Sequence, residues 1–281
     1  MNMKKKDFEN AIAEFLLDQK CSEKSVNTLK KYEHGVRRFV DMLPEDFEIT
    51  KSHTLAYKEM LLGSGYRPAT ISLYIVVMNK YLKWIGAPEL RVKQLKVQRK
   101  SSLSDVLTPE EYNRLLRKAK SRDQFDTYLI MKVLANTGIR VGELKYFTVE
   151  NLKSNYLQID NKGKIRTVPI RQDLARELRK YCRNSNIRTG TIFPGKVKGK
   201  QMAASTIWRR LQRLASELKI KKSKIHPHSF RHLFAKQFLK ENSNGLAELA
   251  DLLGHESLET TRIYLVSTDE EKKKKLEGLK Y

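Results

Sequence analysis

The sequence predicts a mainly α-helical protein with one small antiparallel sheet, organised as two domains. Three observations support this fold class. Apolar residues recur at helical spacing through most of the 281 residues. One stretch, residues 156–169, has instead the pattern of two short strands joined by a hairpin-type turn. A basic segment over residues 91–106 separates the two helical halves and has the composition of a linker.

Residues 1–90 are predicted to form an N-terminal domain of four short helices. Their expected positions are about residues 8–16, 22–42, 52–62 and 68–85. Ser22 opens the second helix, with Ser25 close behind, and Gly63-Ser64-Gly65 ends the third. Pro68 stands where the first turn of the fourth helix would be, and Gly86 follows its last apolar residue. The apolar stripes of these helices are expected to form the core of the domain.

The linker is basic throughout its first part. Residues 91–100 contain no acidic residue and five cations, namely Arg91, Lys93, Lys96, Arg99 and Lys100. A linker of this charge could lie along a DNA backbone, which carries a phosphate charge about every 1.7 Å. An ordinary solvated connector has the same composition, so both interpretations stay open.

Residues 107–281 are predicted to form the second domain, of mixed α/β type. Its first helix begins at Thr108-Pro109-Glu110-Glu111, where threonine is the N-cap, proline takes the first position and Glu111 completes a capping box. A second helix is expected over about residues 125–134. After the two strands the chain is mostly helical again, with Thr191-Ile192-Phe193 as a candidate third strand. Thr268 starts a C-terminal tail helix, expected over residues 268–280, with another capping box.

The charge of the chain indicates the class of its partner. Lys and Arg number 56 against 32 Asp and Glu, so the net charge is +24, and the isoelectric point is near 9.9. Such a charge costs self-repulsion and is typical of proteins that bind a polyanion, DNA or RNA first of all. An anionic membrane surface is the weaker interpretation, because no basic amphipathic helix with exposed Trp or Phe stands out.

Other features of the composition narrow the compartment. No run of about 18 apolar residues is present, so no membrane-spanning helix is expected. The basic start, residues 1–6, has no apolar stretch behind it and therefore differs from a signal peptide. Cys21 and Cys182 are too few and too isolated for a disulfide framework or a zinc site. We expect a protein of the reducing cytoplasm that needs neither a metal nor another cofactor.

A set of cations, histidines and one tyrosine in the second domain indicates its chemistry. In chain order the set is Arg140, Glu143, Lys162, Lys164, His228, Arg231, His255 and Tyr264. The motifs that carry it are Thr137-Gly138-Ile139-Arg140-Val141-Gly142-Glu143-Leu144, Asn161-Lys162-Gly163-Lys164, His228-Ser229-Phe230-Arg231-His232 and Leu253-Gly254-His255. A tyrosine can attack a phosphodiester, and cations can hold the charge that builds on phosphorus without a metal. Arginine suits this task because its fork of donors matches two phosphate oxygens.

Each member taken alone has an ordinary structural explanation. Arg140 is three residues from Glu143 and suits a helical ion pair, and turn lysines such as Lys164 are usually solvated. A histidine at a helix end, like His255, is often a cap, and Tyr264 is one of twelve tyrosines. The joint occurrence of the set in this order makes a shared site the better interpretation.

Two roles within the set each have two candidate residues. His228 lies three residues before Arg231 on the same helical face, whereas His232 does not, so His228 is the better candidate. A lysine at a hairpin tip can reach the minor groove and protonate a departing 5′ oxygen. The choice between Lys162 and Lys164 for that role stays open.

This order and spacing resembles the tyrosine recombinase (phage integrase) family, in particular its simple two-domain members of the Xer-like and transposon-encoded kind. The resemblance covers nearly the whole chain and is sharpest from Thr137 to Leu265. It implies that residues 1–90 are a core-binding domain and that residues 107–281 are the catalytic domain. It also implies a site-specific recombinase that acts on double-stranded DNA without ATP or a divalent metal.

The resemblance implies which residues hold the DNA phosphate. Arg140 and Arg231 match the two catalytic arginines, which bind the scissile phosphate. His255 matches the second histidine of the family, which hydrogen-bonds the same phosphate. Glu143 matches the acidic residue that supports the site.

The resemblance further implies how protons move. Tyr264 matches the nucleophile that forms a 3′-phosphotyrosine, and His228 matches the histidine that assists transfer of its proton. Lys162 matches the hairpin lysine that acts as general acid for the leaving group, and Lys164 leaves a second candidate beside it.

The family's assembly is expected as well. Two sequential strand exchanges through a Holliday junction need four protomers around two DNA sites. In the family a tail such as residues 268–280 docks on the neighbouring protomer. The predicted helices begin almost at Met1, which favours a simple recombinase acting on short core sites. An accessory protein or a second recombinase as partner is left open, as are integration, excision, inversion and resolution as biological roles.

Three rival functions fit part of the same pattern. A type IB topoisomerase has a similar site but works alone and relaxes supercoils. A catalytically inert DNA-binding protein would have the charge without the chemistry, although the complete set argues against it. A protein of an anionic membrane surface would have the charge alone.

Overall fold

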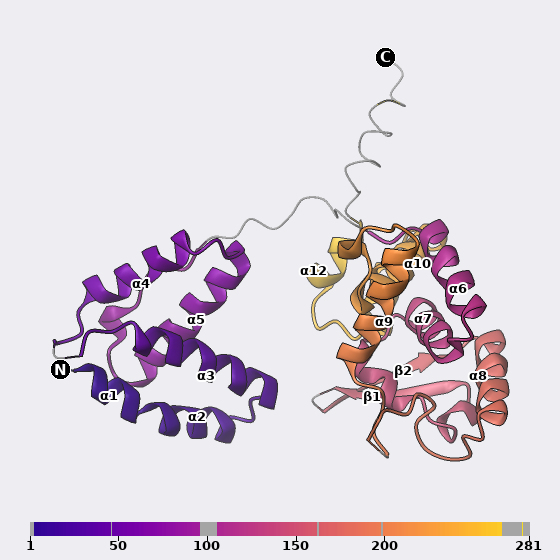
Figure 1. Cartoon of the computed structure of the whole chain (residues 1–281), viewed down its shortest axis with the longest axis horizontal. Coiled ribbons are helices and arrows are strands. Elements are labelled where there is room, and N and C mark those ends of the chain that lie inside the picture. Colours follow the sequence, from indigo (N-terminus) through magenta and orange to yellow (C-terminus); the bar gives the residue numbers. More distant parts are fainter. Residues whose placement is uncertain are drawn as a thin grey trace. The chain divides into compact units, whose positions relative to one another are not determined.

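The computed structural model describes residues 3–45, 47–95, 106–161, 163–197, 199–265 and 277. The chain divides into two compact units, Met1–Arg99 and Lys100–Tyr281 (Figure 1). The division falls within the basic segment 91–106. Three of the cations singled out there, Lys96, Arg99 and Lys100, lie outside the described residues.

The first unit is entirely helical in its described part. Its elements are α1 (Lys5–Asn10), α2 (Ile12–Cys21), α3 (Val26–Asp41), α4 (Lys51–Gly63), α5 (Pro68–Trp84) and the 3₁₀ helix η1 (Pro88–Leu90). The first predicted helix is split at Ala11, although Ala11 N–H still donates to Asp7 O and Phe15 N–H to Ala11 O, so the axis continues. The predicted start of the second helix at Ser22 is wrong. Ser25 is the N-cap, because its Oγ accepts a hydrogen bond from Thr28 N–H at 3.2 Å.

The core of this unit is a cluster of aromatic rings. Phe8, Phe15, Phe39, Tyr57 and Tyr81 are all 0% exposed. Phe15 alone has ring contacts with three neighbours, at centroid distances of 5.1 to 6.1 Å. The hydroxyl of Tyr81 donates to the carbonyl of Phe8, so a polar group buried with the rings is satisfied.

The second unit is mixed, as predicted, with one two-stranded sheet among helices. Its helices are α6 (Pro109–Ser121), α7 (Phe125–Thr137), α8 (Gln172–Asn184), α9 (Ala204–Glu217), α10 (Pro227–Glu241), α11 (Leu246–Leu253) and α12 (Leu258–Thr261), with 3₁₀ helices η2 (Val141–Tyr146), η3 (Asn151–Lys153), η4 (Lys222–Lys224) and η5 (Arg262–Leu265). The capping box of α6 is confirmed, with reciprocal bonds of 3.2 and 3.0 Å between Thr108 and Glu111. The tail helix predicted over 268–280 lies outside the described residues, apart from Glu277.

The sheet is the predicted hairpin. Strand β1 (Tyr156–Asn161) pairs antiparallel with β2 (Lys164–Pro169), from Tyr156 opposite Pro169 to Asn161 opposite Lys164. A two-residue turn joins them, with Gly163 at φ +79° as such a turn requires. The candidate strand at Thr191–Phe193 is wrong, since only an isolated bridge between Thr148 and Thr191 forms there.

Helix α7 is at the centre of this unit, packed against α6, α8, α9 and α10. It ends at Gly138, which has φ +64°. A Cβ at this position would lie 2.4 Å from Phe234 of α10 and 2.7 Å from Leu253 of α11. Only glycine therefore lets the end of α7 approach both helices, and this approach creates the space in which the functional side chains meet.

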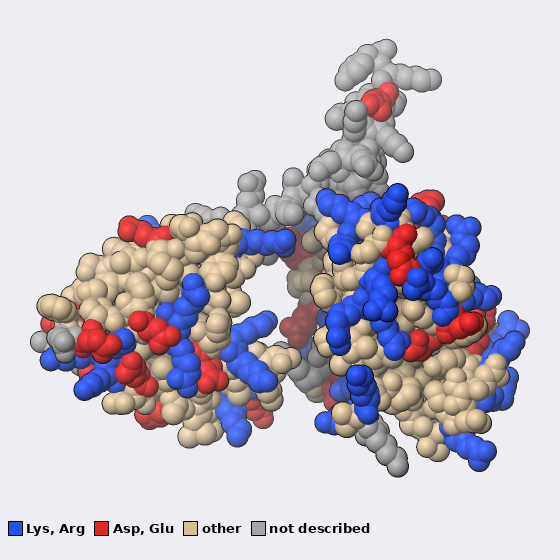
Figure 2. Space-filling view, in the orientation of Figure 1, with Lys and Arg blue, Asp and Glu red and all other residues tan. Residues whose placement is uncertain are grey.

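The surface of both units carries the excess of basic residues. In the view of Figure 2, Lys and Arg gather on the second unit over α9 and α10, with fewer acidic residues among them. Within the described ranges, no helix is both long enough and apolar enough to cross a membrane.

We expect the Phe15→Ala substitution to lower the free energy of unfolding of the first unit by about 3–5 kcal/mol, because it removes a large buried ring. The only two tryptophans lie one in each unit, Trp84 and Trp208. Urea unfolding followed by Trp84 fluorescence in a Trp208→Phe background measures the first unit. Leu17→Ala, at a side chain 59% exposed two residues away, is the control and should change stability by less than about 0.5 kcal/mol. Equal losses in the two variants would contradict this description of the core.

Candidate active site

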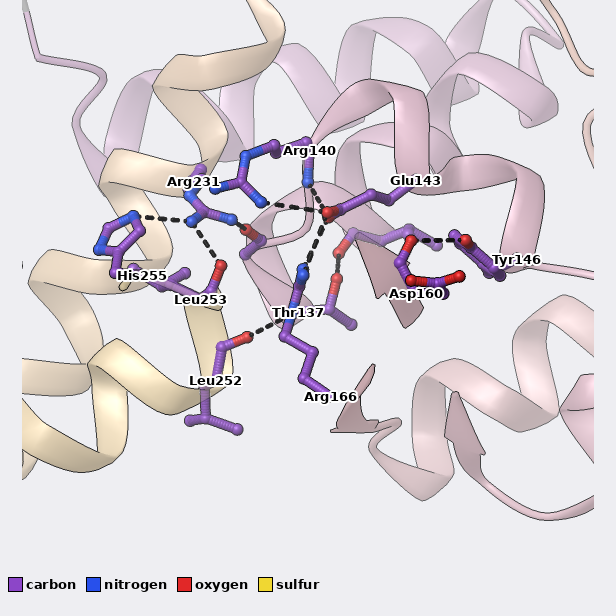
Figure 3. Close-up of polar contacts among 12 residues, drawn as sticks. Thr137, Arg140, Glu143, Tyr146, Asp160, Arg166, Arg231, Leu252, Leu253 and His255 are labelled. Carbon is purple, nitrogen blue, oxygen red and sulfur yellow. Dashed lines mark hydrogen bonds and ion pairs between the residues drawn. The ribbon is translucent and has the colours of Figure 1, made fainter. Parts of the chain in front are cut away.

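Arg231, on α10, is the most deeply buried charged residue of the site, at 1% exposure. Its Nη1 donates to Gly138 O and its Nη2 to Leu253 O, both at 2.7 Å (Figure 3). These carbonyls end α7 and α11, and helix C-termini carry partial negative charge, which offsets part of the cost of burying the guanidinium. Burial, followed by repulsion from Arg140, lowers the pKa of Arg231 to about 10, so the side chain stays charged at neutral pH.

Glu143 lies between two arginines. Its carboxylate accepts Arg166 Nη1 and Nη2 at 3.1 and 2.7 Å, and Arg140 Nη1 at 3.2 Å (Figure 3). The Arg140 backbone N–H also donates to it, at 2.7 Å. Burial on its own would raise the pKa of Glu143, but the hydrogen bonds from Arg166 and Arg140 and their charges lower it below its ordinary value. The carboxylate is therefore ionised and ties Arg140 to strand β2.

Arg140 follows α7 directly and is the more accessible of the two arginines singled out from the sequence. Its side chain is 40% exposed, and one of its five N–H donors is used on Glu143. It lines an open cleft of about 770 Å³ together with Lys164, Arg166 and His255. Donors held in place but not consumed are what an incoming phosphate oxygen needs.

His255 is held at both ring nitrogens. Its Nε2 accepts from Arg231 Nη2 at 2.8 Å, which requires the ring to be neutral. The proton is then on Nδ1, which donates to Thr261 Oγ1 at 2.8 Å, and Thr261 is fully buried. Burial, and after it the charges of Arg231 and Arg140, lower the pKa of His255 to about 4.

Tyr264, in η5, packs between two histidine rings. His255 stacks on it at 6.1 Å and 11°, and His232 meets it edge-on at 5.0 Å and 71°. Only 4% of the tyrosine is exposed. Its ring also belongs to a small apolar cluster with residues of α10 and α11, so its position depends on how these helices pack.

The second α10 histidine lies closer to the tyrosine than the sequence suggested. His228 is exposed, and its ring contacts His232 at 4.8 Å, whereas His232 contacts Tyr264 directly. Loss of water around the rings lowers the pKa of both histidines below the ordinary value: partly for His228, whose residue stays exposed but whose ring is packed against its neighbours, and more strongly for His232, whose pKa reaches about 4. The Nδ1 atom of His232 is buried and finds no hydrogen-bond partner among the described residues. Two neutral imidazoles thus form a row that ends at Tyr264.

The hairpin lysines are only partly described. Lys162 lies outside the described residues. Lys164 begins β2, and its Nζ is 3.0 Å from Glu256 Oε1, with both side chains more than 70% exposed. Arg91 and Lys93 are exposed residues of the first unit. In the described ranges, no three His, Cys, Asp or Glu side chains are grouped so as to hold a metal ion.

Sequence reasoning missed Arg166, Thr261 and the position of His232. Arg166 had a usable signal, since strand residues two apart share a face and Lys164 was already singled out. Thr261 has no such signal, because its role depends on how α12 packs. His232 is four residues from His228 and so shares its helical face, a spacing that comparison with Arg231 alone overlooked.

Comparisons with known proteins agree on one family. Residues 105–271 match the model of the phage integrase family. A tyrosine recombinase XerA from Pyrococcus furiosus is 30% identical over 262 residues, which cover 90% of this chain and 88% of that protein. Among solved structures, the Tn1549 transposon integrase in complex with transposon right-end DNA has a TM-score of 0.71 at 16% identity, covering 99% of each chain. A lambda integrase tetramer bound to a Holliday junction has a TM-score of 0.68 at 19% identity, covering 89% of this chain and 77% of that one.

We expect the stability of the second unit to fall as the pH drops from about 6.5 toward 4. In that window an unfolded histidine, with a pKa near 6.5, binds a proton that folded His232 and His255 do not. Urea unfolding at pH 7 and pH 5, followed by Trp208 fluorescence in a Trp84→Phe background, measures the loss. The His255→Gln variant should lose less stability between these two pH values than the parent.

The matched control for this measurement is His34→Gln, at an exposed histidine of the first unit. It should leave the pH dependence of the second unit unchanged. A His255→Gln variant with the parent's full pH dependence would mean that His255 is not held neutral by its surroundings.

Proposed function

Since this chain belongs to the phage integrase family and is a tyrosine-type site-specific recombinase, we propose that Tyr264 is its nucleophile and that it exchanges DNA strands through a Holliday junction. The observation that carries the proposal is the convergence of Arg231, His255 and Tyr264 from separate segments beside Arg140. No member of this group is brought near the others by sequence adjacency alone.

In the proposed cleavage step the Tyr264 oxygen attacks phosphorus, the bond to the 5′ oxygen breaks, and a 3′-phosphotyrosine forms. Arg140 and Arg231 would hold the two non-bridging oxygens, whose charge grows in the transition state. The tyrosine proton needs an acceptor, and the row of neutral histidines, His232 and His228, supplies one. Attack by the 5′ hydroxyl of a partner strand reverses the step and transfers the strand.

For His255 to donate a hydrogen bond to the phosphate, its Nε2 atom has to gain a proton. Its Nε2 accepts from Arg231, so a phosphate that takes over this arginine donor leaves Nε2 without a partner. A nearby anion favours the protonated ring, because opposite charges raise the pKa of a histidine. His255 would then donate from Nε2 to the phosphate while Nδ1 stays on Thr261, so substrate binding itself prepares the hydrogen bond.

We propose that the working assembly is four protomers on two duplex sites, with the tail segment 268–280 docked on the neighbouring protomer. A lambda integrase tetramer on a Holliday junction, similar in fold, supports the tetramer. The Tn1549 integrase bound to transposon DNA supports integration and excision of a mobile element as the role. Because the proposed substrate is DNA, we place the protein in the cytoplasm.

Covalent capture tests the nucleophile. Incubated with EDTA and nicked duplexes from the DNA beside its own gene, the protein should form an adduct that survives a denaturing gel. Tyr264→Phe should abolish it, whereas Tyr156→Phe, at a tyrosine 57% exposed on β1, should not. Arg140→Ala should slow adduct formation about 10²–10³-fold, because one phosphate donor is lost.

Covalent capture, combined with a gel shift and a plasmid-relaxation assay, separates the rival functions. Binding in a gel shift without any adduct would indicate an inert DNA-binding protein. Relaxation of supercoiled plasmid without junction formation would indicate a topoisomerase. An adduct that persists in Tyr264→Phe would show that another residue is the nucleophile.

A bridging sulfur identifies the general acid. When the 5′ oxygen is replaced by sulfur, the leaving thiol has a pKa near 8.5 and departs without help from an acid. We expect Lys162→Ala to slow cleavage of ordinary DNA about 10²-fold or more and to cleave the sulfur-containing DNA at nearly the parent rate. Lys164→Ala is the matched control. If it alone shows this pattern, Lys164 is the general acid.

A further inference from the structure

Arg166 is the residue at which the hairpin meets the rest of the site. It lies on β2, and its side chain is only 11% exposed. All three guanidinium nitrogens donate: Nη1 and Nη2 to Glu143, and Nε to Leu252 O at 3.2 Å (Figure 3). Nothing in the proposed cleavage step uses this buried cation, although it lines the cleft together with Arg140 and His255.

We propose that Arg166 is a positioning residue that keeps Arg140 available to the phosphate and holds the general-acid hairpin beside the phosphate-binding residues. This inference rests on the proposed function and adds a residue outside the set recognised from the sequence. Arg166 itself touches neither phosphate nor nucleophile in this scheme. It acts through Glu143 on one side and through strand β2 on the other.

Arg166 and Arg140 compete for the carboxylate of Glu143. This carboxylate is 7% exposed, so it cannot be satisfied by water and needs protein donors. Arg166 occupies both of its oxygens in the two-pronged geometry that is strongest between arginine and carboxylate. The Arg140 side chain is left with one contact of 3.2 Å. Without Arg166, the buried carboxylate would draw the Arg140 guanidinium inward and away from the cleft.

Arg166 also anchors the hairpin to the end of α11. Arg166 Nε holds Leu252 O, and the next carbonyl, Leu253 O, is held by Arg231. Two arginines, one from β2 and one from α10, therefore bind the adjacent carbonyls of Leu252 and Leu253, which precede Gly254 and His255. A second link from β2 to this segment, Lys164 to Glu256, is too exposed to fix the strand by itself. Arg166 is thus the buried anchor of the strand that follows the lysine-bearing turn.

Glycine at position 254 is part of the same arrangement. Its φ is +63°, and a Cβ there would lie 2.8 Å from Arg166 Nη1 and 2.9 Å from Cδ. The absence of a side chain at the end of α11 thus leaves room for the Arg166 guanidinium. Lysine cannot replace it, because a single ammonium cannot hold both carboxylate oxygens and the Leu252 carbonyl in one plane.

The test compares Arg166→Lys with the parent on ordinary DNA and on DNA with a bridging 5′ sulfur. We expect adduct formation on ordinary DNA to slow about 10²-fold, as for a misplaced reacting group, with the gel-shift affinity nearly unchanged. On the sulfur substrate the phosphorus–sulfur bond breaks and the thiolate leaves unaided. The deficit should then shrink to about tenfold or less, since only the Arg140 contribution remains.

Two further variants make the test specific. Arg171→Lys is the matched control, because Arg171 also binds a carboxylate through Nε and Nη2 but is 67% exposed; its rates should equal those of the parent. Adding Glu143→Gln to Arg166→Lys should slow cleavage less than Glu143→Gln does alone, because the two residues act as one unit.

The outcomes separate this inference from the proposed function. Equal deficits on both substrates, with a lowered urea midpoint, would show that Arg166 only stabilises the fold. Parent rates in Arg166→Lys would likewise overturn its role while leaving Tyr264 as nucleophile. A parent protein that forms no adduct on either substrate would overturn the proposed function itself.

Discussion

The burial of one positive charge is the constraint on which the rest of the site depends. The Arg231 guanidinium lies beneath the surface and is held by the last carbonyls of two helices, at Gly138 and Leu253. Taking such a group out of water costs several kcal/mol unless its donors are satisfied. These carbonyls can converge only because residue 138 has no Cβ to collide with Phe234. Once α7, α10 and α11 are joined in this way, the chain leaving α11 must place His255 on the same guanidinium.

The hydrogen-bonded group of arginines around Glu143 carries more positive than negative charge before any substrate binds, although Glu248, Asp251 and Glu256 also line the cleft. Arg140, Arg166 and Arg231 carry three positive charges against the single negative charge of Glu143, and burial, followed by repulsion from Arg140, lowers the pKa of Arg231. This repulsion costs stability in the free protein and would be relieved by the proposed binding of a phosphate. A field built from fixed arginines needs no reorganisation during the reaction, which is what electrostatic catalysis requires.

The histidines and arginines of the site differ in protonation state. Arginine keeps its proton at any ordinary pH and so supplies charge, whereas burial holds His232 and His255 neutral. Burial therefore makes the positive charge of Arg231 energetically costly and also keeps the imidazoles beside Tyr264 neutral. Charged arginines and neutral histidines in one site are what the proposed phosphate binding and proton transfer would need at the same pH.

The sequence by itself determined the features that depend on neighbouring residues. The capping box at Thr108, the proline that opens α5 and the glycine turn of the hairpin are local, so their patterns predicted the helices and the sheet correctly. The motifs that contain Arg140, Arg231 and His255 are short local patterns too, and their order, with Tyr264 after them, indicated the chemistry. Only the tertiary structure decided which side chains meet. Arg231 and Gly138 are 93 residues apart and Arg166 and Leu252 are 86 apart, and those contacts follow from helix packing that no short-range pattern records.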